Sequence, residues 1–327
     1  MKLYTSLIAL VIVASLAGTA AGVSEGGAQS LYIQPGGRPA GMGDCYVAAA
    51  DDASAVSWNP AALAFARGRV NFTLMHTQLV PDWDDVYYEY AAYAQRIEGL
   101  GTVGFSIIYL TYGEQFATEA DNPDPIGTFR SYEVIPGLAY GTTIGENLAV
   151  GLGLKFVYVD LAPEQFTLDQ QKGAGSSFAA DIGAVYRTMG GQLRLGGAVQ
   201  NVGPRIAYID EEQSDPLPRN LKLGAAYTLL SDEMNEFMVC GEYNKSLIIV
   251  EDIIDQTTGV ILNAGAEYVY YDLLAFRLGY QYDEDGDVKG FHFGMGLQYQ
   301  NFAFNVANVP QAEGLTRPFR FSLTATF

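Results

Sequence analysis

Residues able to do acid–base chemistry are few in this chain. Its two histidines, His76 and His292, are far apart in the sequence, and no nucleophile motif accompanies either of them. A serine–histidine–aspartate arrangement around His292 is the enzymatic alternative, but it requires a positioned nucleophile. The sequence therefore predicts that the protein is not an enzyme. We interpret His292 as a hydrogen-bonding residue that faces the lumen of the β-barrel predicted below.

The acidic run from Asp283 to Asp287 offers the oxygen ligands that calcium prefers. An EF-hand loop needs glycine in sixth place and glutamate in twelfth, whereas here Gly286 is fourth and Gly294 is twelfth. An acidic hairpin loop is the favoured interpretation, so no metal and no cofactor is predicted. The two cysteines, Cys45 and Cys240, could pair in an oxidising compartment, but spacing alone does not establish a disulfide.

The formal net charge of −19 makes nucleic acid an unsuitable partner, because binding phosphates needs a basic surface. The acidic residues form clusters between predicted strands, near 119–124, 210–215, 251–255 and 283–287. We interpret them as solvated loops. The alternative is that divalent cations bridge them to anionic lipid headgroups.

The first 22 residues have the features of a secretory signal peptide. Lys2 supplies a positive charge, an apolar stretch follows from Leu7 to Leu16, and small residues from Ala17 to Gly22 suit a signal peptidase. We expect residues 1–22 to be removed during export.

The chain ends in a strand, Pro318 to Phe327, that alternates apolar and polar residues and closes with phenylalanine, as outer-membrane barrels do. Similar alternating segments recur along the chain and are long enough to cross a membrane when tilted. They begin near Arg69, Val86, Thr102, Phe129, Asn147, Ser176, Gln192, Arg219, Asn235, Val260, Leu273, Lys289, Asn301 and Pro318. The predicted fold is all-β, a fourteen-stranded antiparallel transmembrane β-barrel over residues 69–327.

The connections between these strands alternate between longer and shorter. The longer ones are expected near 114–128, 162–175, 202–218 and 247–259. Outer-membrane barrels have long external loops and short periplasmic turns, so this alternation predicts that both termini are periplasmic. We therefore expect the protein in the bacterial outer membrane, in contact with membrane lipid and lipopolysaccharide.

Residues 23–68 do not alternate. Glycines cluster in the run Gly41, Met42, Gly43 and Asp44, and Asp51 or Asp52 could cap a short helix. In the later run Trp58, Asn59, Pro60 and Ala61, the asparagine suits an N-cap and the proline suits the first helical position. We predict that this segment is a small helical hatch in the lumen, folded into the periplasmic mouth of the barrel.

Pro136 and Gly137 interrupt the fourth predicted strand. Because proline cannot donate to the sheet ladder, the pair predicts a bulge or a break. One interpretation is a device for curvature. The other is a lateral opening through which an apolar molecule could leave the lumen.

The run from Gly36 to Ala64, GGRPAGMGDCYVAAADDASAVSWNPAALA, resembles the N-terminal segment of the PorV/PorQ outer-membrane proteins and, more distantly, of the FadL fatty-acid channels. The resemblance implies a fourteen-stranded outer-membrane barrel in which the NPA element, here Asn59 to Ala61, lies in the hatch. It also implies two alternative functions. The first is a component of type IX secretion that handles exported proteins with other secretion components, and the second is passive uptake of hydrophobic small molecules.

Overall fold

The computed structural model describes residues 27–83, 85–119, 122–167, 171–209, 214–247, 259–312 and 314–327. In these residues fourteen antiparallel strands form one closed barrel, in which each strand pairs with its sequence neighbours and β1 pairs with β14. The strands are β1 (Val70–Gln78), β2 (Val86–Ile97), β3 (Gly101–Glu119), β4 (Asn122–Ile144), β5 (Leu148–Ala162), β6 (Gly173–Thr188), β7 (Leu193–Val202), β8 (Asn220–Ser231), β9 (Asn235–Ser246), β10 (Val260–Tyr270), β11 (Leu274–Asp283), β12 (Val288–Tyr299), β13 (Phe302–Asn308) and β14 (Phe319–Thr326).

This architecture confirms the predicted fold. Alternation decides which side chains face outward: in β12 Phe291 and Phe293 are exposed on the outer wall, while His292 between them is buried in the lumen. Because successive side chains of a strand point to opposite faces, large apolar residues cover the outside and small or polar residues line the inside. The expected signal peptide lies outside the described residues. No helix in the described part of the chain is long and apolar enough to cross a membrane.

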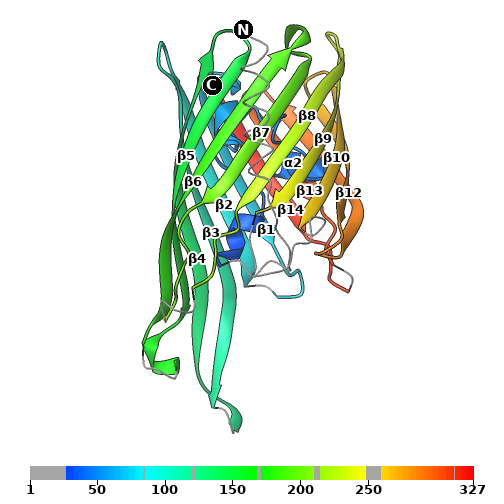
Figure 1. Cartoon of the computed structure of the whole chain (residues 1–327). Coiled ribbons are helices and arrows are strands. Elements are labelled where there is room, and N and C mark those ends of the chain that lie inside the picture. Colours follow the sequence, from blue (N-terminus) through cyan, green and yellow to red (C-terminus); the bar gives the residue numbers. More distant parts are fainter. Residues whose placement is uncertain are drawn as a thin grey trace.

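One predicted connection is wrong. Residues 114–128, expected to form a loop, belong mostly to β3 and β4, which stay paired from Glu114 opposite Arg130 to Glu119 opposite Asn122. At about 3.3 Å per residue the 23 residues of β4 extend roughly 75 Å, far more than a membrane crossing requires. The β3–β4 hairpin therefore projects well beyond its neighbours, at the end of the barrel opposite the C-terminus (Figure 1).

Aromatic rings mark a boundary on the outer wall. Tyr87, Tyr109, Tyr132 and Tyr158 form a row across β2 to β5, with 6.2 Å between the centroids of successive rings. Amphipathic rings favour the membrane–water boundary, so this row lies at the level where the membrane ends and the projecting strands begin. On the projecting side of the row, the short helix η3 (Glu164–Phe166) packs Phe166 against Phe129 of β4, with 5.7 Å between ring centroids.

The turns at the other end of the barrel are short. The 3-10 helix η4 (Met189–Gly191) forms one of them, and Phe327 lies at this end, where its carbonyl accepts the amides of Arg69 and Val70. Since short turns are periplasmic in outer-membrane barrels, this is the periplasmic end, and the acidic hairpin Asp283–Asp287 lies at the external end.

The segment before β1 fills the lumen. It contains η1 (Gln29–Tyr32), α2 (Gly37–Gly41), α3 (Ala55–Trp58) and η2 (Pro60–Phe65), and its helices are enclosed by the strands (Figure 1). The amide of Gly27 donates to Pro216 in the external β7–β8 connection, at 3.0 Å. The hatch thus runs from the external end to the periplasmic end rather than occupying the periplasmic mouth alone. This corrects the expectation that the segment before Arg69 is periplasmic, because its small and apolar side chains are buried along the whole lumen.

Candidate functional site

The hatch lies directly against the inner wall of the barrel. At several inward-facing strand glycines the hatch backbone occupies the space that a side chain would need. A Cβ atom on Gly279 would lie 2.0 Å from the amide nitrogen of Gly43, one on Gly151 would lie 2.3 Å from that of Ala61, and one on Gly196 would lie 2.5 Å from the Val47 carbonyl oxygen. The close contact between the hatch and the wall therefore depends on glycines in the wall as well as on the hatch.

The predicted glycine-rich run is the part of the hatch that faces β11 and β12. Met42 is buried, and Gly43 and Asp44 both have positive φ angles, of 71° and 54°. Asp44 then forms an ion pair with Arg320 of β14, with 3.1 Å between Oδ1 and Nη1. Gly43 is required because of both its backbone conformation and its contact with Gly279.

A buried charge network joins the hatch to the wall. Arg38 of α2 donates to Asp51 of the hatch at 2.6 Å and to Glu267 of β10 at 2.7 Å. Arg67 donates to Asp51 at 2.8 Å, and Arg277 of β11 donates to Glu267 at 2.6 Å. Because Asp51, Glu267 and Arg277 are almost fully shielded from water, removing one of their partners leaves a buried charge unpaired and destabilises the hatch.

The two adjacent aspartates have opposite environments. Burial opposes the ionisation of Asp51, but Arg38 and Arg67 outweigh it and hold its pKa below the usual value. Burial and the charge of Asp51 raise the pKa of Asp52, whose Oδ1 accepts the amide and hydroxyl of Ser54. Ser54, the N-cap of α3, makes no side-chain capping bond, and of the two expected caps only Asp52 makes a capping-type bond, from the Ser54 amide to its Oδ1 at the start of the helix. Asp51 is a charge anchor instead.

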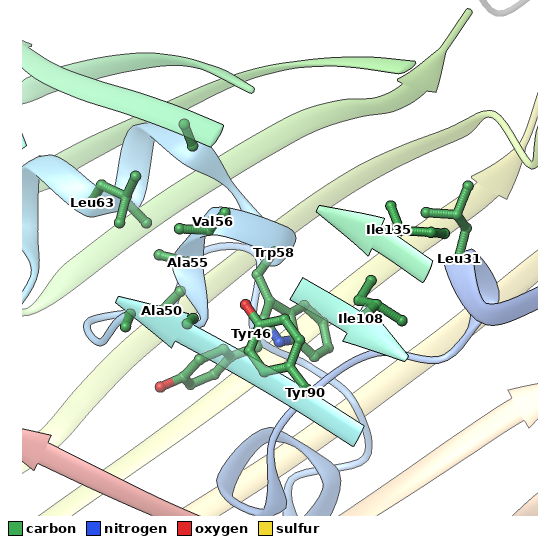
Figure 2. Close-up of a cluster of buried hydrophobic side chains, with 14 of the residues drawn as sticks. Leu31, Tyr46, Ala50, Ala55, Val56, Trp58, Leu63, Tyr90, Ile108 and Ile135 are labelled. Atoms are coloured by element: carbon green, nitrogen blue, oxygen red, sulfur yellow. The ribbon is translucent and has the colours of Figure 1, made fainter. Parts of the chain in front are cut away.

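Trp58 is the centre of the buried cluster shown in Figure 2, where it lies beside Tyr46 and Tyr90. Its ring meets Tyr46 edge-on, with 5.5 Å between centroids, and its Nε1 donates to the Pro35 carbonyl at 2.8 Å. The ammonium of Lys222, on β8, lies 4.3 Å from the ring centroid. Trp58 therefore joins two distant hatch segments to the wall.

Asn59 caps η2, and Pro60 begins this helix. Asn59 Oδ1 accepts the amide of Ala61 at 3.1 Å, as predicted, although η2 is a 3-10 helix. Its Nδ2 also donates to the Val47 carbonyl at 2.9 Å and reaches the wall at the Ala184 carbonyl, 3.2 Å away. The asparagine therefore links three parts of the structure, which its sequence context alone does not indicate.

Two buried glutamates that sequence reasoning missed hold the hatch backbone. Glu133 of β4 accepts the amides of Gln29 and Ser30, each at 3.0 Å. Glu242 of β9 accepts those of Tyr46 and Val47, each at 2.8 Å. The available signal was an isolated acid at an inward position of a membrane strand, which is costly unless it has a partner.

The histidines occupy opposite faces of the wall. His292 is buried in the lumen, with Nδ1 2.7 Å from the Ala40 carbonyl oxygen and Nε2 3.2 Å from Gln281 Oε1. His76 is on the outer wall, where Nδ1 is 2.8 Å from Glu89 Oε1. The geometry therefore joins His292 to the hatch and does not bring the histidines together.

The remaining candidate residues are the two cysteines and the acidic hairpin. Cys45 and Cys240 are free thiols in contact, since Cys240 Sγ donates to the Cys45 carbonyl at 3.3 Å. In the acidic hairpin, Asp283 Oδ1 accepts the Gly286 amide at 2.9 Å. Within the described ranges, no group of three or more histidine, cysteine or acidic residues is arranged to hold a metal ion.

Pro136 and Gly137 do not bulge β4. The pairing with β5 has the same register on both sides, with Val134 opposite Tyr158 and Gly137 opposite Lys155, and only the two intervening residues lack partners there. Of the two predicted alternatives, a bulge or a break, the pairing with β5 therefore shows the break, because the proline removes ladder bonds without adding a residue to one strand. A local gap in hydrogen bonding remains.

A closed barrel with a lumen hatch, short turns at one end and long connections at the other is the architecture of an outer-membrane β-barrel. Solved structures share this fold. The deltaS2 mutant of the monoaromatic hydrocarbon channel TodX has a TM-score of 0.59 and 13% identity, covering 89% of this chain and 97% of that chain. The Ralstonia pickettii toluene transporter TbuX has a TM-score of 0.56 and 14% identity, covering 90% and 98%. A Pseudomonas aeruginosa FadL homologue has a TM-score of 0.53 and 12% identity, covering 95% and 100%.

The comparison of sequences identifies a narrower family than the comparison of folds does. The family model described as "Type IX secretion system protein PorV" matches residues 22–252, so the chain belongs to the PorV family. No curated protein sequence matches the chain. The family is described as a secretion-system protein, and the structurally similar proteins are described as a channel and a transporter.

Proposed function

We propose that this protein is an outer-membrane component of a type IX secretion route, which receives exported proteins and passes them to other components without conducting them through its own lumen. The observation that carries this proposal is the hatch, whose backbone is in direct contact with the glycines of the wall. Membership of the PorV family supports the same route. The proposal includes export by residues 1–22, cleavage of that segment, and insertion among outer-membrane lipid and lipopolysaccharide.

The projecting β3–β4 hairpin is the surface we assign to exported proteins. Phe116 on this hairpin is 67% exposed and lies beyond the tyrosine row, where we expect water rather than lipid. A photo-crosslinking amino acid at Phe116 should capture an exported protein in cells. The matched control is Leu154, which is 64% exposed but lies on the outer wall of β5 within the membrane band.

Deleting the gene should remove a set of proteins from the culture medium, measured by mass spectrometry, and the wild-type gene should restore them. Unchanged export together with no capture at Phe116 would contradict the proposed function.

Uptake of hydrophobic small molecules is the second candidate. It is favoured by the gap in the β4–β5 ladder and by a cavity of about 400 Å³ at the external end, beside Leu31, Tyr32 and Ile261. Pro136→Val restores a ladder donor and should therefore reduce uptake of a fluorescent long-chain fatty acid if the gap is an exit. Gly137 is left unchanged because a Cβ there would lie 2.9 Å from Ser106 Oγ. Equal uptake by the wild type, the variant and the deletion strain would eliminate this candidate.

A further inference from the structure

A polar cavity of about 200 Å³ lies at the periplasmic end of the lumen, between the hatch and the wall. Arg38, Asp51 and Arg67 line it on the hatch side, and Arg277 and Asn305 line it on the wall. The side chain of Arg67 is 51% exposed, so the cavity is accessible from this end. Neither the buried network nor the proposed handling of exported proteins accounts for it.

Arg277 carries unused binding capacity into this cavity. Its side chain is 0% exposed, and Nε donates to Glu267, but neither Nη1 nor Nη2 has a hydrogen-bond partner. Asn305 Oδ1 is also unpartnered. Buried donors are normally satisfied, so two adjacent free donors on one guanidinium point to a missing acceptor.

A glycine keeps the space beside this guanidinium open. A Cβ atom on Gly296 would lie 2.8 Å from Arg277 Nη1, 3.1 Å from Nη2 and 2.7 Å from Asn305 Oδ1. Any larger residue would displace the groups that line the cavity, so Gly296 provides a means of filling the site without changing its charge.

The geometry and the charges at the site favour a ligand that carries one carboxylate. Arg38, Arg67 and Arg277 contribute three positive charges, and Asp51 and Glu267 already neutralise two of them. Asp52 balances the third positive charge only when it is ionised, and burial and the charge of Asp51 oppose this by raising its pKa. Asp52 also lines the cavity, although its oxygens are directed to Ser54 and Tyr46. A dianion would face repulsion from these carboxylates, whereas a guanidinium binds a single carboxylate with two parallel hydrogen bonds.

We propose that this cavity is a binding site for a carboxylate group, held by Arg277 Nη1 and Nη2. The carboxylate could come from the end of a peptide chain or from a free small acid, and the site does not depend on the proposed function. Because Nη1 and Nη2 are free, binding there does not require Arg277 to release Glu267, which is held by Nε.

The test is isothermal titration calorimetry of the full mature chain in detergent, with acetate, N-acetyl-triglycine, N-acetyl-triglycinamide and sulfate. Binding of acetate or N-acetyl-triglycine at least tenfold tighter than the amide supports the site. If the peptide binds tenfold more tightly than acetate, the ligand is a chain end. Equal affinities assign the site to free small acids. Absence of binding by both carboxylates, equal binding of the amide, or tighter binding of sulfate overturns the proposal.

Two variants locate the binding. Gly296→Ala should lower carboxylate affinity at least tenfold. Arg277→Gln should have the same effect and replaces Gly296→Ala in the test if that variant does not fold. Gly241→Ala is the matched control, because a Cβ at that position meets nothing within 4 Å and affinity should not change. Folding is checked by heat-dependent migration in gel electrophoresis. Wild-type affinity in a folded Gly296→Ala or Arg277→Gln protein would contradict the assignment.

Discussion

Asn59 shows how much of the hatch depends on single side chains. It is completely buried, accepts the Ala61 amide, and donates to carbonyl groups of both the hatch and the wall. The sequence context predicts the cap, because asparagine before proline suits a helix start. The sequence context could not reveal which carbonyl groups accept from Asn59 Nδ2. Val47 and Ala184 become neighbours of Asn59 only when the barrel closes around the hatch.

Asn59→Leu should destabilise the hatch by about 3 kcal/mol, the sum of a lost cap and the carbonyl groups left without donors. The measurement is the urea midpoint of Trp58 fluorescence in a Trp83→Phe background, because Trp58 is buried in the hatch cluster. Asn147→Leu, at an exposed turn, is the control and should leave the midpoint unchanged. A hatch as stable in the Asn59 variant as in the control would show that these bonds contribute little.

The paired aspartates predict a pH optimum for hatch stability. Despite the opposing effect of burial, Arg38 and Arg67 hold the pKa of Asp51 below its unfolded value of about 3.9, so its stabilising contribution is present above pH 4 and is lost as the pH falls further. Burial and Asp51 raise the pKa of Asp52, so its contribution is present below about pH 4 and declines as the pH rises through the raised value.

The urea midpoint measured by Trp58 fluorescence should therefore be highest near pH 4. Asp52→Asn should remove the decline above that pH, whereas Asp51→Asn should lower the midpoint at pH 7. A midpoint that keeps the same decline in Asp52→Asn would assign the pH dependence to other groups.

Strands were predicted far more accurately than the interior. β1, β2 and β10 begin at or within one residue of the expected positions, because alternation is a local pattern that the wall preserves. β4 begins seven residues before the expected Phe129, since its outer half lies beyond the membrane and is not constrained to large apolar residues on one face. Acceptors such as Glu242 were missed because their partners are distant in the sequence.

Inward glycines are the element-scale feature that decides how closely the hatch approaches the wall. Gly279→Ala places a methyl group 2.0 Å from the Gly43 amide nitrogen and 2.4 Å from the Met42 carbonyl carbon, so the hatch backbone must shift. Overpacking of this kind costs about 1–3 kcal/mol. The urea midpoint of Trp58 should fall accordingly, while Gly241→Ala should keep it. Equal midpoints would mean that the hatch has freedom to move away from β11.

At the scale of the molecule, the hatch spans the lumen from one end of the barrel to the other. It starts beside the long β7–β8 connection and ends where Arg69 meets Phe327, so the same segment touches both ends of the barrel. From the lengths of the connections we expect the short turns and Phe327 to be periplasmic, and the acidic hairpin and the β3–β4 projection to be external.

An epitope tag inserted after Asp285 should be labelled by antibody on intact cells, because this residue lies in the external β11–β12 hairpin. The same tag after Asn301, in the periplasmic β12–β13 turn, should be labelled only after permeabilisation. The opposite pattern of labelling would reverse the topology.

Conductance in planar lipid bilayers tests the central claim, that the hatch closes the lumen so that the barrel acts by binding rather than by conducting. We predict no stable conductance steps from the wild-type protein, because the hatch backbone is in contact with Gly279, Gly151 and Gly196 of the wall. Deletion of residues 27–65, which leaves the strands intact, should produce steady open channels. Stable wild-type steps as large as those of the deletion variant would contradict the account.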